Sequence, residues 1–192
     1  KAGQGNERKY RITAEPVADA GRVFSMDSHA SVTAHAIGGD TLWVADLTAP
    51  GEREGTGSGG GLALGDGKVF ATTTFGELVA LSPATGEVLW RQKFEAAVHG
   101  APTVANGQVY VNTASSVAYA INTDTGRIAW RIAGVPTQVG VAGTAAPALS
   151  GNNVIFPLAN GSLIAADIGQ GEVSWVARVP GDRPGRARQA LQ

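Results

Sequence analysis

Three histidines are the first side chains in this sequence that could carry acid–base or metal chemistry: His29, His35 and His99. The surrounding residues place His29 at a turn between strands and His35 at the end of a strand. His99 comes just before the extended segment 101–104. The spacing of the three matches no metal-ligand motif. We therefore expect structural roles for them, and His99 has the strongest claim to another role.

Pairs of carboxylates could act as a general acid and a general base. The aspartates that could form such pairs are Asp27, Asp46, Asp66, Asp124, Asp167 and Asp182. Most of them stand in turn positions, where aspartate is favoured because its side chain hydrogen-bonds to nearby backbone. No pair is set apart from the repeating pattern of the chain, so the sequence predicts no catalytic residue.

The glycine-rich stretch GTGSGGG at 55–61 is compatible with two enzyme loops by composition alone. A phosphate-binding loop needs Gly-x-x-x-x-Gly-Lys-Ser/Thr and then a helix whose N-terminus holds the phosphate. A Gly-x-Ser-x-Gly nucleophile elbow needs a strand before it and a helix after it. Here the glycines lead into LALGDGKVF, which is typical of a pair of strands. We predict a flexible linker and small residues where strands crowd together.

The composition narrows the class of protein further. The net charge is −1 and the sequence pI is about 6.3, which argues against a general binder of nucleic acid or of membrane surfaces. The chain has no Cys, which excludes disulfides and thiolate metal sites. No stretch approaches the roughly 18 apolar residues of a membrane span. The first residue is Lys, so we expect a processed or truncated N-terminus.

A sequence pattern that occurs four times in the chain determines where these residues lie in the fold. The four Trp are spaced by 47, 40 and 45 residues, and a Gly precedes each of them by four residues. These pairs are Gly39 and Trp43, Gly86 and Trp90, Gly126 and Trp130, and Gly171 and Trp175. Three short runs rich in Val, Ile, Thr and aromatics precede each pair, bounded by Gly, Asn, Asp or Ser. Four strands in about 40–45 residues are typical of a β-propeller blade.

The predicted fold is therefore all-β, with about four four-stranded blades in a single propeller fragment spanning 1–192. The predicted blades cover 12–50, 58–95, 99–135 and 143–180, and 181–192 is a loop toward a further blade. The Trp side chains are predicted to be the large apolar plates on which neighbouring blades pack. We expect an open arc from a ring of about eight blades. Because its two end faces are uncovered, we expect residues 1–192 alone to aggregate or express poorly.

The units resemble the repeats of pyrroloquinoline-quinone (PQQ)-type propellers. GKVFATTTFGELVALSPATGEVLW at 67–90 matches that repeat almost throughout, and GQVYVNTASSVAYAINTDTGRIAW at 107–130 matches it well. The resemblance covers about 15–180. Two branches matter: the quinoprotein dehydrogenases and the non-enzymatic outer-membrane assembly factor BamB. The segments 10–35, 59–81 and 143–165 look like the second branch.

Resemblance to the BamB branch implies a periplasmic, outer-membrane-associated scaffold without cofactor, which binds the POTRA domains of the barrel-inserting subunit. A lipid anchor outside this chain would be its only attachment to the membrane. One docking loop of that branch corresponds to 139–147 here. Val139 and Val141 stand at the apolar positions of that loop, and Ala142 stands where an Arg is expected. The resemblance also implies a second docking loop, in which Arg186 or Arg188 would bind the partner.

Two alternatives stay open. A fragment of a PQQ- and calcium-dependent dehydrogenase would share the repeat, but that branch has a vicinal disulfide, and this chain has no Cys. It also shows no insertion rich in Asp and Asn to hold calcium. Another propeller scaffold, such as the sensor part of a membrane kinase, fits as well. Calcium-dependent folding or quinone absorbance would separate the dehydrogenase from both scaffolds.

Overall fold

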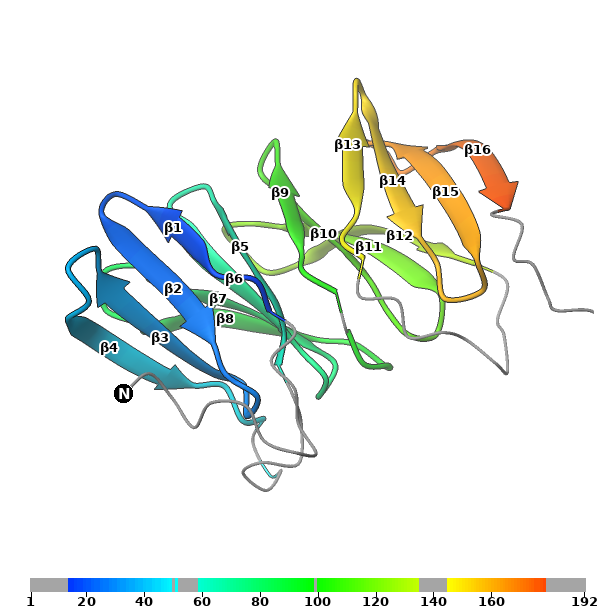
Figure 1. Ribbon diagram of the computed structural model, residues 1–192. Helices are drawn as coiled ribbons and strands as arrows, with labels where there is room; N and C mark the ends of the chain where they lie inside the picture. Colours follow the sequence, from blue (N-terminus) through cyan, green and yellow to red (C-terminus); the bar gives the residue numbers. More distant parts are fainter. Residues whose placement is uncertain (1–13, 50, 52–58, 99, 135–144, 179–192) are drawn as a thin grey trace, which may run out of the picture.

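The computed structural model describes residues 14–49, 51, 59–98, 100–134 and 145–178 (Figure 1). These residues form sixteen strands in four sheets, and each sheet is an antiparallel meander in chain order. No part of the chain that the structure describes forms a helix that could cross a membrane. The prediction of an all-β fold with four four-stranded blades is confirmed.

The strands have these bounds. Blade 1 contains β1 (Val17–Asp19), β2 (Arg22–Met26), β3 (Ser31–Ala36) and β4 (Thr41–Asp46). Blade 2 contains β5 (Gly59–Gly65), β6 (Lys68–Thr73), β7 (Glu77–Leu81) and β8 (Val88–Lys93). Blade 3 contains β9 (Thr103–Ala105), β10 (Gln108–Asn112), β11 (Val117–Asn122) and β12 (Ile128–Ala133). Blade 4 contains β13 (Ala148–Ser150), β14 (Asn153–Pro157), β15 (Ser162–Asp167) and β16 (Val173–Arg178).

Two-residue turns set the register of the first hairpin in blades 2 and 3. Asp66 and Gly67 connect β5 to β6, and Asn106 and Gly107 connect β9 to β10. All four residues have positive φ, between 46° and 73°. Such turns match the right-handed twist of the paired strands, and Asn, Asp and Gly tolerate their backbone angles best. The Asp-Gly and Asn-Gly pairs in the sequence therefore fix where β6 and β10 begin.

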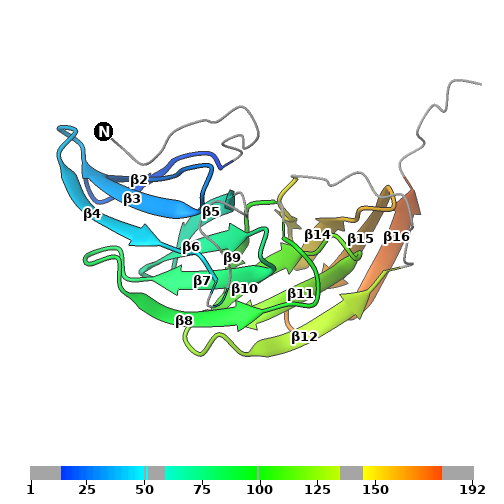
Figure 2. The same ribbon diagram turned by 90° about the horizontal axis from the view of Figure 1, so that it is seen from below.

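The four blades form an arc (Figure 2), in which β8 and β12 run along the convex edge. Each blade packs against the next through a separate apolar core. The side chains alternate along a strand, so one set faces the following blade and the other set faces the preceding one. We call these the forward and backward faces. Phe24, Phe70 and Tyr110 occupy the same forward position in blades 1, 2 and 3.

Glycines in β5 allow the first strands of neighbouring blades to approach closely. A Cβ atom on Gly61 would lie 2.4 Å from Ala101 Cα, and one on Gly65 would lie 2.3 Å from Val104 Cγ1. No larger residue fits either position without moving the next blade. The prediction that glycines of this stretch stand where strands crowd is confirmed for Gly60 and Gly61, while 55–58 lie outside the described residues.

Candidate functional site

The predicted partner-binding residues cannot be placed by the structure. Val139 and Val141 fall between β12 and β13, and Arg186 and Arg188 follow β16. All four lie outside the described residues, as does His99. Their role in binding stays a prediction. Among the described residues, the candidate sites lie at the junctions between blades and at the edges of those junctions.

The four Trp lie in the outermost strands, and three of them form a repeated junction. The indole N–H groups of Trp43, Trp90 and Trp130 donate to the carbonyl oxygens of Pro83, Thr123 and Ile168 in the following blade, at 3.1, 3.0 and 3.2 Å. Each indole also covers the glycine of that same turn, which is Gly86, Gly126 or Gly171. We call this arrangement the Trp junction. Each glycine thus receives the Trp of the preceding blade, not the one four residues after it.

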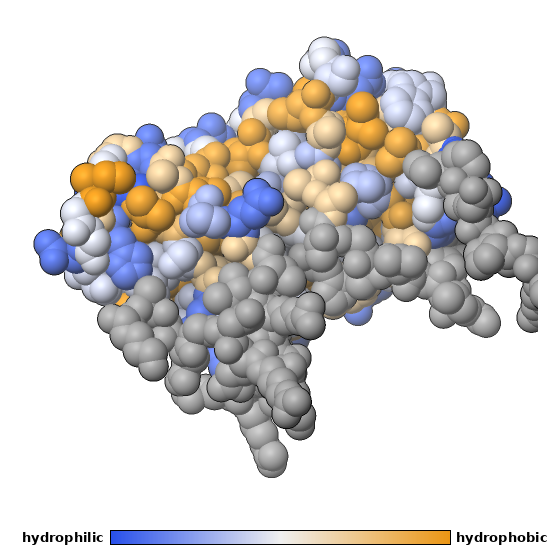
Figure 3. All heavy atoms as spheres, in the orientation of Figure 1, coloured by the Kyte–Doolittle hydropathy of each residue, from blue (hydrophilic) through white to orange (hydrophobic). Residues whose placement is uncertain are grey.

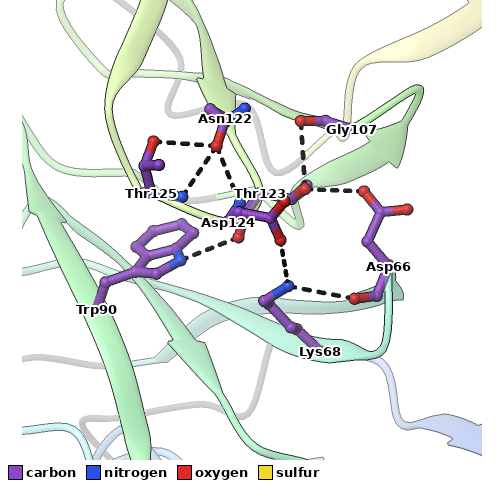
Figure 4. A network of polar contacts seen from close by, with 8 residues as sticks. All are labelled: Asp66, Lys68, Trp90, Gly107, Asn122, Thr123, Asp124 and Thr125. Carbon is purple, nitrogen blue, oxygen red and sulfur yellow. Dashed lines mark hydrogen bonds and ion pairs between the residues drawn. The ribbon is translucent and has the colours of Figure 1, made fainter.

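A polar cluster joins blades 2 and 3 beside the second Trp junction (Figure 4). Lys68 Nζ lies 2.8 Å from Asp124 Oδ1 and donates to the Asp66 carbonyl oxygen at 3.3 Å. Thr123 Oγ1 donates to Asp66 Oδ2 at 2.9 Å. The charges of Lys68 and Asp124 neutralise each other, and the Thr123 hydroxyl is shared between Asp66 Oδ2 and the Gly107 carbonyl oxygen, 3.2 Å away. This cluster therefore holds two turns together and is not arranged for proton transfer.

A cavity of about 360 Å³ opens next to this cluster, between blades 1 and 2. Its lining includes Asp19, Asp66 and Lys68. Two of these three charged groups already serve the polar cluster. Small-molecule sites place a few convergent polar groups on a mainly apolar wall. This cavity has more polar than apolar lining, and its one cation is paired, so it is a weak candidate for a ligand site.

A groove of about 430 Å³ lies at the convex edge, between β8 of blade 2 and β12 of blade 3. We call it the outer groove, and its lining residues are Lys93, Phe94, Glu95, Tyr119, Ile128 and Arg131. The rings of Phe94 and Tyr119 form its floor, with centroids 4.8 Å apart. Exposed charged residues and the 41% exposed Ile128 form its rim. An aromatic floor with an arginine rim is typical of protein-binding surfaces.

Arg131 differs from its counterpart in blade 2. Arg91 holds the same position in β8, where its Nη1 lies 2.7 Å from Glu77 Oε2 and donates to the Leu47 carbonyl oxygen at 3.3 Å. In blade 3, Val117 stands where Glu77 stands in blade 2. The side chain of Arg131 makes no hydrogen bond or ion pair to the described residues. Its guanidinium therefore faces solvent at the rim of the outer groove.

The histidines that the structure describes lie in blade 1 and serve local structure. Asp27 Oδ1 accepts the backbone N–H groups of His29 and Ser31, both at 2.9 Å, which closes the turn before β3. His35 Nδ1 lies 3.4 Å from Thr41 Oγ1. Across the described ranges, no group of three or more His, Cys, Asp or Glu side chains could hold a metal ion.

Apolar residues also reach the surface on the face seen in Figure 3. There they form a broken band across the row of blades, from blade 1 to blade 4. Polar residues interrupt the band at several places. Exposed apolar surface of this kind suits contact with other proteins.

A family model described as outer membrane protein assembly factor BamB matches residues 28–191. No curated protein matches the chain in sequence. Among solved structures, BamB from Moraxella catarrhalis is similar with a TM-score of 0.70 and 21% identity, over 88% of this chain and 48% of that one.

The chain is also similar to solved structures with other descriptions. A quinohemoprotein alcohol dehydrogenase from Pseudomonas putida HK5 matches with a TM-score of 0.71 and 20% identity, over 91% of this chain and 35% of that one. The computationally designed protein Ika8 matches with a TM-score of 0.70 and 20% identity, over 90% of this chain and 51% of that one. At this identity, the similarity concerns the fold. The chain spans about half, or less, of the length of these three proteins.

Proposed function

Because the chain belongs to the family of the outer membrane protein assembly factor BamB, we propose that it is a non-enzymatic scaffold of the machinery that assembles outer-membrane β-barrels. In this proposal it works in the periplasm, associated with the outer membrane. It binds the POTRA domains of the barrel-inserting subunit and needs no cofactor. The observation that carries the proposal is the family match over 28–191, which includes β3 and β4 of blade 1 and all of blades 2, 3 and 4.

The geometry of the described residues supports a binding role. The blades are locked by Trp junctions and by buried cores, so they can present surface groups in fixed positions. A rigid surface binds with a smaller loss of conformational entropy than a flexible one. The outer groove supplies the features of a binding hot spot, because it combines aromatic rings with the exposed Arg131.

Recognition would combine two kinds of contact. Val139 and Val141 would bury apolar surface against a POTRA domain, while Arg186 or Arg188 would orient it through carboxylates or strand-edge carbonyl oxygens. Arg131 would add a further charged contact to an acidic side chain of the same partner. The edge of a POTRA sheet could also pair with an exposed strand of this chain.

The experiment is calorimetry of the purified chain with purified POTRA domains. We expect binding that Val141→Asp, Arg186→Glu and Arg188→Glu each weaken about tenfold or more, as truncation of hot-spot contacts does. Arg131→Glu should weaken it by a similar factor if the outer groove takes part. Arg127→Glu is the matched control, because Arg127 is also exposed but lies on the turn before β12 and outside the groove.

The outcomes separate the function from its sites. Binding that none of the variants weakens would keep the scaffold function and discard the proposed contact residues. Failure of the folded wild-type chain to bind POTRA domains would contradict the scaffold function. Calcium and PQQ titrations, read by thermal stability and quinone absorbance, would then test the dehydrogenase alternative.

A further inference from the structure

The outer groove between blades 2 and 3 holds an arginine that lacks a carboxylate. Arg131 in β12 and Arg91 in β8 hold the same position on the backward faces of their blades. Arg91 is paired with Glu77, whereas Arg131 is exposed and its side chain makes no hydrogen bond or ion pair to the described residues. Blades 1 and 4 carry Val44 and Val176 at this position. Within the described blades, the unpaired arginine is therefore a particular feature of the outer groove.

Arg91 shows what an arginine at this position binds. Its Nη1 lies 2.7 Å from Glu77 Oε2 and donates to the Leu47 carbonyl oxygen at 3.3 Å. The backbone N–H of Phe94 donates to the turn before β7, as that of Leu47 donates to the turn before β3, so these two residues hold the same place. The outer groove thus retains the counterpart of the carbonyl acceptor, at Phe94, and lacks the carboxylate that would neutralise Arg131.

A second polar group of the outer groove has no partner. Tyr119 is only 5% exposed, yet its hydroxyl makes no hydrogen bond to the described residues, whereas the hydroxyl of Tyr110 donates to Gln108. Within the described ranges, the side-chain oxygens that are both unpaired and fully enclosed belong to Thr73 and Ser116. The Tyr119 oxygen is therefore not enclosed, and it opens into the groove that its residue lines. Because nearly buried polar groups usually have a partner, this hydroxyl indicates a place for an acceptor atom of a ligand.

The remaining lining of the outer groove suits a ligand that is both anionic and apolar. The rings of Phe94 and Tyr119 give it an aromatic floor, and Ile128 adds exposed apolar surface at the side. Two cations, Lys93 and Arg131, stand against one anion, Glu95, so the lining carries an excess of one positive charge. Complementary charge gives specificity to a contact between proteins.

The arrangement in blade 2 also indicates how such a ligand is built. The carboxylate that pairs with Arg91 belongs to the extended strand β7, in which Val79 lies two residues after Glu77 and points to the same side. The groove itself lies between β8 and β12, each of which is the last strand of its sheet and faces outward (Figure 2). An extended segment of another protein can therefore approach this groove from the solvent.

We propose that the outer groove binds an extended segment of a partner protein in which an acidic residue is followed, two residues later, by an apolar one. The carboxylate accepts hydrogen bonds from the Arg131 guanidinium and the Tyr119 hydroxyl. The apolar side chain lies against Phe94 and Ile128. This inference rests on the proposed scaffold function for the class of its occupant, a protein, and adds the sequence pattern by which that partner is recognised.

The test uses a peptide that copies the carboxylate-bearing strand of blade 2. Its sequence is TFGELVALS, residues 74–82, with both ends blocked and a fluorescent label. A second peptide carries the change Glu77→Gln. We expect the anisotropy of the first peptide to rise and saturate as the purified chain is added. The glutamine peptide should bind at least about tenfold more weakly, because hydrogen bonds to a charged group are worth more than those to a neutral one.

Variants of the chain identify the groups that hold the carboxylate. Arg131→Gln should weaken binding of the glutamate peptide at least about tenfold and leave binding of the glutamine peptide nearly unchanged, because the two changes remove the same interaction. Tyr119→Phe keeps the ring and should weaken binding about two- to tenfold. Arg127→Gln is the matched control, since Arg127 is exposed but lies outside the groove, and it should bind as the wild type does. Circular dichroism verifies that each variant is folded.

Three results would overturn the proposal: no saturable binding of the glutamate peptide, equal binding of the two peptides, or binding that Arg131→Gln leaves unchanged. Unchanged binding by Tyr119→Phe would remove the hydroxyl from the site. These results are independent of the calorimetry with POTRA domains. Binding of POTRA domains without binding of the peptide would keep the scaffold function and discard the groove as a site. Binding of the peptide through Arg131 without binding of POTRA domains would keep the site and contradict that function.

Discussion

The indole N–H of Trp90 donates a hydrogen bond to the carbonyl oxygen of Thr123, at 3.0 Å and 33 residues further along the chain. The ring of the same Trp covers Gly126, so one side chain satisfies a turn's carbonyl group and fills the space above its glycine. The relationship links the outermost strand of blade 2 to the outer turn of blade 3. The pairs Trp43–Pro83 and Trp130–Ile168 repeat it.

Gly126→Ala should destabilise the chain more than Gly107→Ala does. Both glycines have positive φ, +69° and +73°, where an L residue costs about 1–2 kcal/mol. A Cβ on Gly126 would also lie 2.7 Å from Trp90 Cδ2, whereas Gly107 has open space. Overpacking of this kind adds about 1–3 kcal/mol. Urea unfolding of the two variants measures the difference, and equal losses would argue against the clash with Trp90.

Ser116→Gly should stabilise the chain by about 1–2 kcal/mol. Ser116 has a φ of +62° just before β11, where blades 2 and 4 carry Gly76 and Gly161. Its hydroxyl is buried and has no hydrogen-bond partner among the described residues. The glycine relieves both costs. Ser116→Ala removes only the hydroxyl and should gain less, so thermal melts that rank alanine above glycine would contradict this account.

Arg91→Gln should cost about 2–4 kcal/mol, because it leaves the Glu77 carboxylate, only 6% exposed, without its cation. The matched variant Arg131→Gln removes an arginine from the same position in the next blade, where no ion pair forms with the described residues. Its effect should stay within about 0.5 kcal/mol. Chemical denaturation distinguishes the two, and similar losses would mean that the Glu77 pair contributes little.

Tyr110→Phe should alter the stability of the chain mainly at alkaline pH. Burial, together with the charge of Asp167, raises the pKa of Tyr110 from 10.0 to about 12. The unfolded chain therefore loses this proton at lower pH than the folded chain does. Stability from this group is complete below pH 10.0 and is lost as the pH rises through about 12.

The phenylalanine variant has no such proton, so its free energy of unfolding should fall less steeply over that range. Below it, the variant should lose about 1 kcal/mol with the hydrogen bond from Tyr110 Oη to Gln108 Oε1. Phe24 and Phe70 hold the same forward position, so the ring itself should fit. Parallel pH profiles for the two proteins would contradict the raised pKa.

The strands were predictable because their apolar runs are short and their turns carry Gly, Asn or Asp. The run ELVAL coincides with β7, Glu77–Leu81. The innermost strands were less well bounded: the strand pair predicted from LALGDGKVF at 62–70 begins earlier, because β5 spans Gly59–Gly65. The glycines of β5 show no alternation of apolar and polar side chains that would indicate a strand. The close approach of Ala101 to Gly61, which only the structure shows, is the reason for a glycine there.

The pairing of each Trp with a glycine was visible in the sequence, but the partner was not. The spacing of four residues suggested one unit, whereas Gly126 actually receives Trp90. That contact depends on how two blades pack. The outer groove escaped prediction for the same reason. Arg131 is exposed because Val117, not a carboxylate, holds the place on the neighbouring strand that Glu77 holds in blade 2, and a single strand cannot reveal this. The predicted contacts Val139, Val141, Arg186 and Arg188 stay predictions.

In each Trp junction, the Trp precedes the turn that covers it in the sequence. During synthesis on the ribosome, each Trp is therefore made before its cover. Trp43 leaves the ribosome before the turn at Gly86 exists, so it stays uncovered for about 40 further residues. At about 5–20 residues per second, each blade waits about 2–8 s for its cover. During that interval the newest blade offers a bare indole. Each new turn releases the preceding blade from that exposed state.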